Sequence, residues 1–205
     1  MEGQFTLPAG MGVLPALNGK LIVHLHRMNY FELYGIPVTF EVDPGVLKKK
    51  YYELSRRYHP DFFTQASPEE QADVLEKSSQ VNKAYKAFRD KDSTMQYLLE
   101  MKGLVEPEEK YQLDPMFLSE VMDINEQLME WEMEEDPELL ERAETAANEL
   151  LKSIYDEVEQ DMAGYQEAVT SEKALLRVKD YYYRKKYLQR ILDKIASSRN
   201  IATRK

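Results

Sequence analysis

Four helix starts are written into the sequence in the same way, and they constrain the fold more than any other feature. Each places a capping side chain directly before a proline: Asp43-Pro44, Ser67-Pro68, Asp114-Pro115 and Asp136-Pro137. The capping oxygen accepts a backbone N–H that a helix leaves unpaired at its start, and proline at the first helical position has no N–H to leave unpaired. We expect a fifth long helix from Thr170 or Ser171 and a shorter one over roughly Thr94 to Lys102. Because no stretch shows convincing strand alternation, the sequence predicts an all-α protein.

Apolar residues recur at helical spacing on the first two of these helices. The helix from Asp43 carries Leu47, Tyr51, Leu54 and Tyr58 on one face, and the helix from Ser67 carries Val74, Ser78, Val81, Tyr85 and Phe88. Two amphipathic helices joined by a short turn pack antiparallel, so this part of the sequence predicts a helical hairpin.

The three later helices carry their apolar residues at heptad spacing. The seams are Phe117, Val121, Ile124, Leu128 and Trp131, then Leu140, Ala147, Leu150, Ile154 and Val158, then Ala174, Val178, Tyr181, Leu188, Leu192 and Ile195. Three long helices with short connections predict an antiparallel bundle. The stretch MKGLVEPEEKYQLDP (101–115) has a glycine, two prolines and a shift in charge, which indicates a domain boundary. We therefore expect a first domain over 28–103, a linker over 104–113 and a second domain over 114–205.

Charge is distributed unevenly along the chain. The net charge is −10, and residues 28–103 hold 11 Lys and Arg against 12 Asp and Glu, whereas the chain from 104 onward holds 14 against 24. A nucleic-acid-binding protein needs a net attraction for phosphate, so the acidic second half argues against nucleic acid as a partner.

The chain lacks the residues that several other classes of protein require. It has no Cys, which excludes disulfides, thiolate zinc sites and Cys nucleophiles and is compatible with the reducing cytoplasm, where we expect the protein to act. The longest apolar run is far too short to span a bilayer, so no membrane association is expected. Residues 1–27 lack the basic start of a signal peptide, and we expect either a disordered tail or a segment upstream of a working start at Met28.

The stretch RRYHPDFF (56–63) places His59, Pro60 and Asp61 on the turn of the predicted hairpin. A catalytic His-Asp pair would need a nucleophile within hydrogen-bond reach, and no nucleophile-elbow sequence is present. The other two histidines, His24 and His26, are a weak metal signal, and no glycine-rich loop could hold a phosphate. The sequence therefore predicts no catalytic residue, no metal and no cofactor, so the protein is not expected to be an enzyme.

The helix before this turn carries a cationic face. At 100° per residue, Lys49, Lys50, Arg56 and Arg57 centre opposite the apolar face of the same helix, together with Glu53. A stripe of charges is most often a solvated surface, and Pro-Asp alone is common turn chemistry. A basic face that ends in a rigid polar turn on a helical hairpin is a much rarer combination.

That combination resembles the J domain, the module that recruits ATPase chaperones of the DnaK type. The resemblance implies that His59, Pro60 and Asp61, with Lys49, Lys50, Arg56 and Arg57 behind them, dock on the ATPase and stimulate its ATP hydrolysis. Many J domains have a lysine after the tripeptide, whereas Phe62 follows it here.

Four stretches, one of which contains the tripeptide, resemble the HscB-type co-chaperones: MNYFELYGIP (28–37), YHPDFF (58–63), VNKAYKAFRD (81–90) and YLLEMKG (97–103). The resemblance implies a J domain over 28–103, followed by an acidic three-helix bundle. It also implies two partners: a dedicated DnaK-type chaperone similar to HscA, and the iron–sulfur scaffold protein IscU, which the bundle would hold.

The helix from Asp114 has a second apolar stripe outside its heptad seam. With Phe117 as zero, Leu118, Met122, Met129 and Met133 fall at roughly 100–160°, and Asp123, Glu126 and Glu130 border them. The helix could simply pack against two neighbours, but apolar residues with an acidic rim are also typical of a partner surface. By the resemblance, Leu118, Met122, Asp123, Glu126 and Glu130 match scaffold-binding positions, and an aromatic contact on the last helix maps to Tyr182 or Tyr183.

Two alternative functions remain open at this stage. The same J domain could deliver a different client, or the chain could be a structural helical adaptor in which His-Pro-Asp is a chance turn. Stimulation of a chaperone ATPase separates the adaptor from the other two hypotheses, and binding of IscU separates those two from each other.

Overall fold

The computed structural model describes residues 29–202, so the expectation for residues 1–27 lies outside the described part of the chain. The elements in order are α1 (Tyr30–Tyr34), α2 (Pro44–Arg57), the 3₁₀ helix η1 (Pro60–Phe63), α3 (Pro68–Phe88), α4 (Lys91–Met101), α5 (Pro115–Glu134), α6 (Pro137–Asp156), α7 (Glu159–Ala163) and α8 (Glu172–Ala202). No strand occurs within residues 29–202, and the predicted all-α class is confirmed.

All four cap-proline pairs begin helices as predicted. The capping oxygens of Asp43, Ser67, Asp114 and Asp136 accept backbone N–H groups at 2.7, 3.2, 2.7 and 2.9 Å. Helix α8 begins at Glu172, and the hydroxyl of Ser171 accepts the N–H of Ala174 at 3.2 Å. Of the two candidates for the start of this helix, Ser171 is therefore the cap.

The shorter helices depart from the expectation. Helix α4 begins at Lys91, three residues before Thr94, because the Asp90 carboxylate accepts the N–H of Ser93 at 2.8 Å. Helices α1 and α7 were not predicted. Helix α1 begins with a capping box. The Asn29 side chain accepts the backbone N–H of Glu32 at 2.9 Å, and the Glu32 side chain accepts the backbone N–H of Asn29 at 3.1 Å.

The hairpin of α2 and α3 is closed at its base by α1 and α4. Phe31 of α1 packs on Phe88 of α3 with ring centroids 4.6 Å apart, and Tyr97 of α4 packs on Phe31 at 5.7 Å. The Tyr34 hydroxyl donates to the carbonyl oxygen of Val81 at 2.8 Å, so this buried polar group has a partner. The cluster holds the base of the hairpin, and the opposite end projects into solvent.

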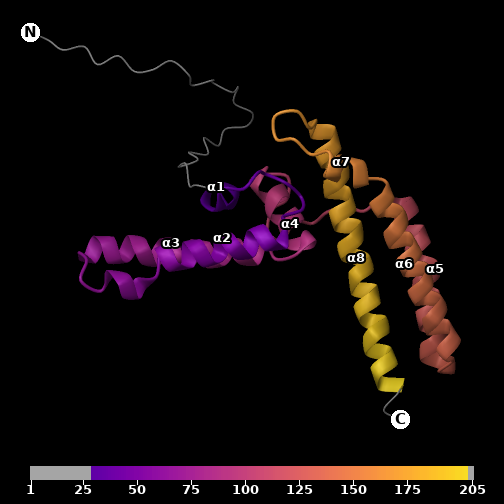
Figure 1. Cartoon of the computed structure of the whole chain (residues 1–205). Helices are drawn as coiled ribbons and strands as arrows, with labels where there is room; N and C mark the ends of the chain where they lie inside the picture. Colours follow the sequence, from indigo (N-terminus) through magenta and orange to yellow (C-terminus); the bar gives the residue numbers. More distant parts are fainter. Residues whose placement is uncertain (1–28, 203–205) are drawn as a thin grey trace, which may run out of the picture.

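In the second half of the chain, α6 packs against both α5 and α8 (Figure 1). Phe117, Val121, Ile124 and Leu128 are buried as predicted. In α8, however, Ile191 is buried and Leu192 is only half-buried, so the predicted seam is wrong by one position there. The buried face of α8 turns along the helix, because α8 packs against α4 as well as against α5 and α6: Leu175 and Tyr182 are buried in its first half, and Ile191 and Ser198 in its second half.

The segment 104–113 is packed against α8. Tyr111 stacks on Tyr183 with centroids 4.3 Å apart, and Glu109 accepts a hydrogen bond from Lys179 Nζ at 2.6 Å. Lys185 of α8 also forms an ion pair with Asp92 of α4. Figure 1 shows the consequence: the α2–α3 hairpin and the α5–α6–α8 bundle extend in different directions from one junction, which gives an L-shaped molecule.

Candidate functional site

The His-Pro-Asp turn lies at the free end of the hairpin and is held by its own backbone. Helix α2 ends at Arg57, and His59 begins the 3₁₀ helix with Pro60 at its first position. His59 Nδ1 accepts the backbone N–H of Asp61 at 3.3 Å, and the N–H of Phe62 donates to the His59 carbonyl at 3.1 Å. All three residues of the motif are exposed.

This geometry suits recognition by another molecule. Because Nδ1 of His59 is an acceptor in the turn, the neutral ring carries its proton on Nε2, which remains available to a partner. The Asp61 carboxylate lies 3.7 Å from Nδ1 and is itself exposed. The turn therefore offers an outward-facing donor and an outward-facing acceptor on a short, constrained backbone.

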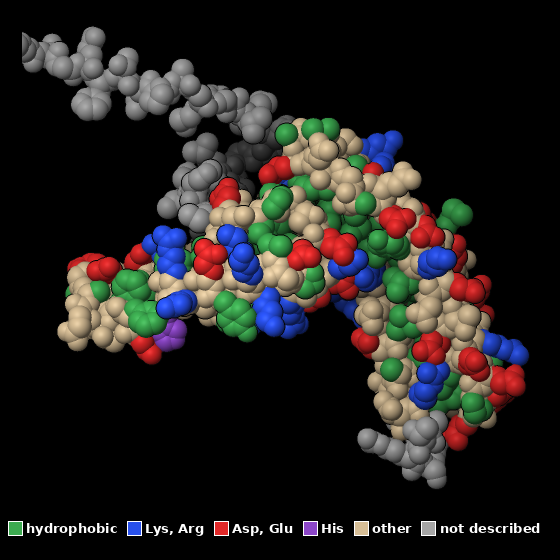
Figure 2. Space-filling view, in the orientation of Figure 1, with side chains coloured by type: hydrophobic (Ala, Val, Ile, Leu, Met, Phe, Trp, Pro, Cys, Tyr) green, Lys and Arg blue, Asp and Glu red, His purple; other side chains and the backbone are tan. Residues whose placement is uncertain are grey.

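The predicted basic residues do not all face the same way. Lys49, Arg56 and Arg57 are exposed, whereas Lys50 is half-buried and lies 3.7 Å from Glu53. Arg57 makes a cation–π contact with Tyr58, in which its guanidinium carbon lies 5.5 Å from the ring centroid. Figure 2 shows cations spaced along the arm that ends at the histidine. Lys50 and Arg57 thus flank the face on which Lys49 and Arg56 are central.

Sequence reasoning missed two residues on this arm. Tyr52 lies one helical turn before Arg56 and is exposed, and Lys48 is exposed one turn before Tyr52. Phe62 in the turn is also exposed, at 68%, and its ring centroid lies 5.6 Å from that of His59. The arm therefore carries two exposed aromatic side chains, Tyr52 and Phe62. At 100° per residue Tyr52 lies off the apolar face of α2, roughly 130° from its centre, and this signal could have identified it.

The second predicted surface lies on α5. Leu118 and Met122 are exposed, as are Asp123, Glu126 and Glu130. The buried seam occupies the other side of the helix, where Phe117 meets Tyr187 of α8 edge to face at 6.2 Å. The five predicted residues therefore lie on the solvent side of α5 and leave the core to the seam.

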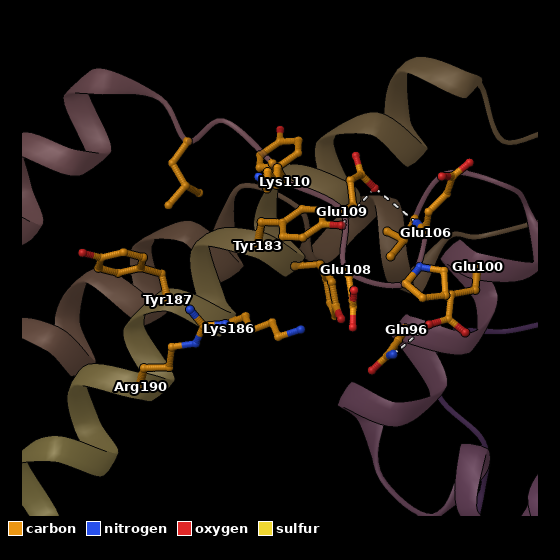
Figure 3. Close-up of a pocket in the computed structure, with 15 residues that line it drawn as sticks. Gln96, Glu100, Glu106, Glu108, Glu109, Lys110, Tyr183, Lys186, Tyr187 and Arg190 are labelled. Atoms are coloured by element: carbon orange, nitrogen blue, oxygen red, sulfur yellow. Dashed lines mark hydrogen bonds between the residues drawn. The ribbon is translucent and has the colours of Figure 1, made fainter.

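The two candidate aromatic residues of α8 lie near the linker. Tyr182 is buried, and Tyr183 is half-buried beneath Tyr111, where its hydroxyl donates to Glu109 at 3.0 Å. Both line a hollow of about 500 Å³ between α4, the linker and α8, into which Lys186 and Arg190 also project (Figure 3). The ring of Tyr187, and not that of Tyr182 or Tyr183, contacts Phe117 near the start of α5.

Burial and hydrogen bonding account for the titration behaviour of these tyrosines. Burial raises the pKa of Tyr111 to about 12, with the hydrogen bond to Asp180 adding to the shift. Burial also raises the pKa of Tyr183, and its hydrogen bond to Glu109 acts in the same direction. These hydroxyls are therefore neutral donors that hold the linker in place.

Among residues 29–202, no group of three or more His, Cys, Asp or Glu side chains is arranged to hold a metal ion. Within the same range, no helix is both long enough and apolar enough to cross a membrane.

Two family models match the chain, in the order that the resemblance implied. Residues 29–97 match the DnaJ domain, and residues 113–196 match the HSCB C-terminal oligomerisation domain. The first match ends before the segment 104–113 that packs against α8, and the second begins at the last residue of that segment.

Relatives and solved structures agree with the domain models. A "Co-chaperone protein HscB homolog" from Vibrio cholerae is 38% identical over 112 residues, which is 54% of this chain and 66% of the relative, just under two thirds of its length. A homolog of the same name from Vibrio parahaemolyticus is 34% identical over 137 residues, 66% of this chain and 80% of the relative.

The structure of chaperone HscB from Vibrio cholerae superposes with a TM-score of 0.68 at 28% identity, covering 84% of this chain and 98% of that one. The crystal structure of human co-chaperone protein HscB gives a TM-score of 0.66 at 30% identity, covering 85% and 83%. The predicted resemblance is confirmed, and the chain belongs to the HscB co-chaperone family.

Proposed function

We propose that this chain is a co-chaperone of iron–sulfur cluster assembly, which recruits a DnaK-type ATPase chaperone of the HscA kind and stimulates its ATP hydrolysis. The observation that carries this proposal is the exposed His59-Pro60-Asp61 turn at the tip of a hairpin with a cationic face, within a segment that matches the DnaJ domain. In this role the protein regulates the hydrolysis that its partner carries out.

The second half of the proposal is that α5 presents the scaffold protein IscU to the chaperone. The exposed Leu118 and Met122, with Asp123, Glu126 and Glu130 beside them, supply an apolar centre with a polar rim. Tyr182 and Tyr183 remain candidates for the aromatic contact. Because Tyr182 is buried and Tyr183 lies beneath Tyr111 of the linker, a partner would reach them through the hollow shown in Figure 3.

Holding both partners on one chain supports delivery. Once the scaffold is bound to the bundle and the chaperone to the hairpin, the encounter between scaffold and chaperone is effectively intramolecular. Its rate then depends on an effective concentration that is set by the shape of the molecule. The L shape, with the two surfaces on different arms, leaves each surface open while the other is occupied.

The chaperone interaction is tested with His59→Gln in a single-turnover ATPase assay with the cognate DnaK-type chaperone. We expect stimulation to be lost and the melting temperature to stay unchanged, because an exposed turn residue contributes little packing. Gln65→Ala, an exposed change in the same loop, is the control and should stimulate normally. Full stimulation by the His59 variant would refute the assignment of this turn.

The scaffold interaction is tested with the double variant Leu118→Gln/Met122→Gln, which keeps side-chain length and helix propensity. Loss of burial at about 25 cal/mol per Å² should weaken IscU binding by a few kcal/mol, with little change in stability. Val121→Ser on the buried seam should instead lower stability by several kcal/mol. Thermal melting and IscU titration on the same preparations separate the two effects. A parent protein that stimulates the ATPase but does not bind IscU would indicate a different client.

A further inference from the structure

The exposed apolar surface of α5 continues beyond the residues assigned to the scaffold. Met129 is 63% exposed and Met133 is 78% exposed, and both follow Leu118 and Met122 on one side of the helix at spacings of four, seven and four residues. From first to last the stripe spans about 22 Å at 1.5 Å per residue. We call Leu118, Met122, Met129 and Met133 the α5 stripe.

The side chains of the α5 stripe do not pack into the core of the bundle. Phe117, Val121, Ile124 and Leu128 already form the face of α5 that packs inward, and each is at most 3% exposed. The stripe lies roughly 100–160° around the helix from Phe117. Four large apolar side chains in a row on the solvent side are therefore left for something other than α6 and α8 to cover.

The charge of α5 indicates the chemistry of what covers it. The helix carries six carboxylates and no Lys, Arg or His. Glu132 pairs with Lys194 of α8 at 2.9 Å. The other five are exposed, and within residues 29–202 no ion pair is seen for any of them: Glu120, Asp123, Glu126, Glu130 and Glu134. Glu126, Glu130 and Asp123 lie nearest the stripe, at roughly 180°, 220° and 240° around the helix from Phe117, so one side of the stripe is bordered by negative charge that has no ion-pair partner among the described residues.

Charge complementarity decides between the possible occupants. Two copies of α5 facing each other would bring like charges together around the stripe, and such juxtaposition disfavours a contact. A segment with apolar side chains flanked by Lys or Arg satisfies both features at once. Methionine, which is unbranched and flexible, adapts readily to the side chains of such a segment.

We propose that the α5 stripe is one continuous docking surface, and that it takes a basic amphipathic segment of the scaffold partner. The apolar side chains of this segment cover the four residues of the stripe, and its cations face the flanking carboxylates. The proposal rests on the proposed function, and it adds Met129 and Met133 to the site together with the chemistry of the segment that binds there.

The first test is the double variant Met129→Gln/Met133→Gln. We expect IscU affinity to fall by about tenfold or more, with an unchanged melting temperature, because the removed apolar surface is buried only in the complex. The matched control is Met116→Gln, since Met116 is also 78% exposed on α5 but lies off the stripe, at roughly 260° from Phe117. The control should bind like the parent.

The second test uses peptide probes that do not depend on IscU. Fluorescence anisotropy is measured with a helical peptide of leucine and lysine at amphipathic spacing, with a twin in which glutamate replaces lysine, and with a twin in which serine replaces leucine. We expect the leucine–lysine peptide alone to bind tightly, to weaken with added salt, and to lose about tenfold in affinity with the Met129/Met133 variant.

The outcomes separate this proposal from the function on which it rests. If the Met129/Met133 variant binds IscU and the peptide like the parent, while Leu118→Gln/Met122→Gln loses IscU, the extended stripe is refuted and the proposed function stands. If the parent fails to bind IscU but binds the peptide through Met129 and Met133, the docking chemistry stands and the scaffold assignment falls. If the parent sediments as a dimer that the Met129/Met133 change dissociates, the occupant is a second copy and the proposal is overturned.

Discussion

At the scale of single residues, Glu109 connects the linker to α8. Its carboxylate accepts hydrogen bonds from Lys179 at 2.6 Å and from Tyr183 at 3.0 Å. The bond from Lys179 lowers the pKa of Glu109 below its ordinary value of 4.5, against an opposing effect of burial, and the bond from Tyr183 assists it. Since the folded pKa lies below the unfolded one, the ionised group stabilises the fold above pH 4.5, and this contribution is lost as pH falls through the folded pKa.

Glu109→Gln should therefore lower the free energy of unfolding more at about pH 7 than at about pH 3, because the stabilisation by the ionised carboxylate declines as the pH falls below 4.5. Urea denaturation at both pH values measures the difference. Glu120→Gln, which removes an exposed carboxylate of α5, is the control and should change little at either pH. An equal loss of stability at both pH values would show that the charge of Glu109 does not matter.

At the scale of elements, the start of α4 depends on one side chain. The Asp90 carboxylate accepts the N–H of Ser93 at 2.8 Å and its hydroxyl at 3.0 Å, and Thr94 is buried one turn into the helix. Asp90→Ala should lower the free energy of unfolding by about 1 kcal/mol, because a helix N–H loses its acceptor. Asp90→Asn keeps an acceptor and should cost much less. Urea denaturation distinguishes the two, and equal losses would mean that the charge, and not the cap, is what stabilises α4.

At the scale of the whole molecule, the junction sets the angle between the two arms. Three contacts hold this junction. The linker is joined to α8 by the Tyr111–Tyr183 stack, and α4 is joined to α8 by the Asp92–Lys185 ion pair. The end of α4 is joined to the α7–α8 loop by the ion pair of Lys102 with Glu167 at 2.8 Å. Because contacts of several kinds act together, we expect the arms to keep one relative orientation in solution.

Spin labels can test this orientation without interference, since the chain has no cysteine. Spin labels are attached at Ser79→Cys on α3 and Ser153→Cys on α6, both of which are exposed. Pulsed electron paramagnetic resonance should then give a narrow distribution of distances between the two labels in the parent. Adding Tyr111→Ala should broaden it, because the stacked ring no longer holds the linker against α8. A distribution that stays equally narrow would mean that the ion pairs alone hold the junction.

The sequence was most informative where structure depends on neighbours along the chain. Four helix starts follow from a capping side chain and a proline next to each other, and the buried seam of α5 follows from its spacing. Helix α1 was missed although Asn29 and Glu32 carry the spacing of a capping box, because five residues give too short a periodic signal. Helix α4 begins earlier than the sequence predicts, because its cap, Asp90, is not followed by the proline that marks the other helix starts.

By itself, therefore, the sequence determined the fold class, the hairpin with its His-Pro-Asp turn, and the side of α5 on which Leu118 and Met122 lie. Only the tertiary structure decided that Tyr182 is buried and Tyr183 stacks on the linker, that Tyr187 meets Phe117, and that Ile191 is buried where Leu192 was expected. Local hydrogen bonds and helical periodicity involve residues a few positions apart, so they can be read from the chain. Contacts across the junction join residues about 70 positions apart, as Tyr111 and Asp180 are, and they depend on how whole helices pack, which no short stretch of sequence specifies.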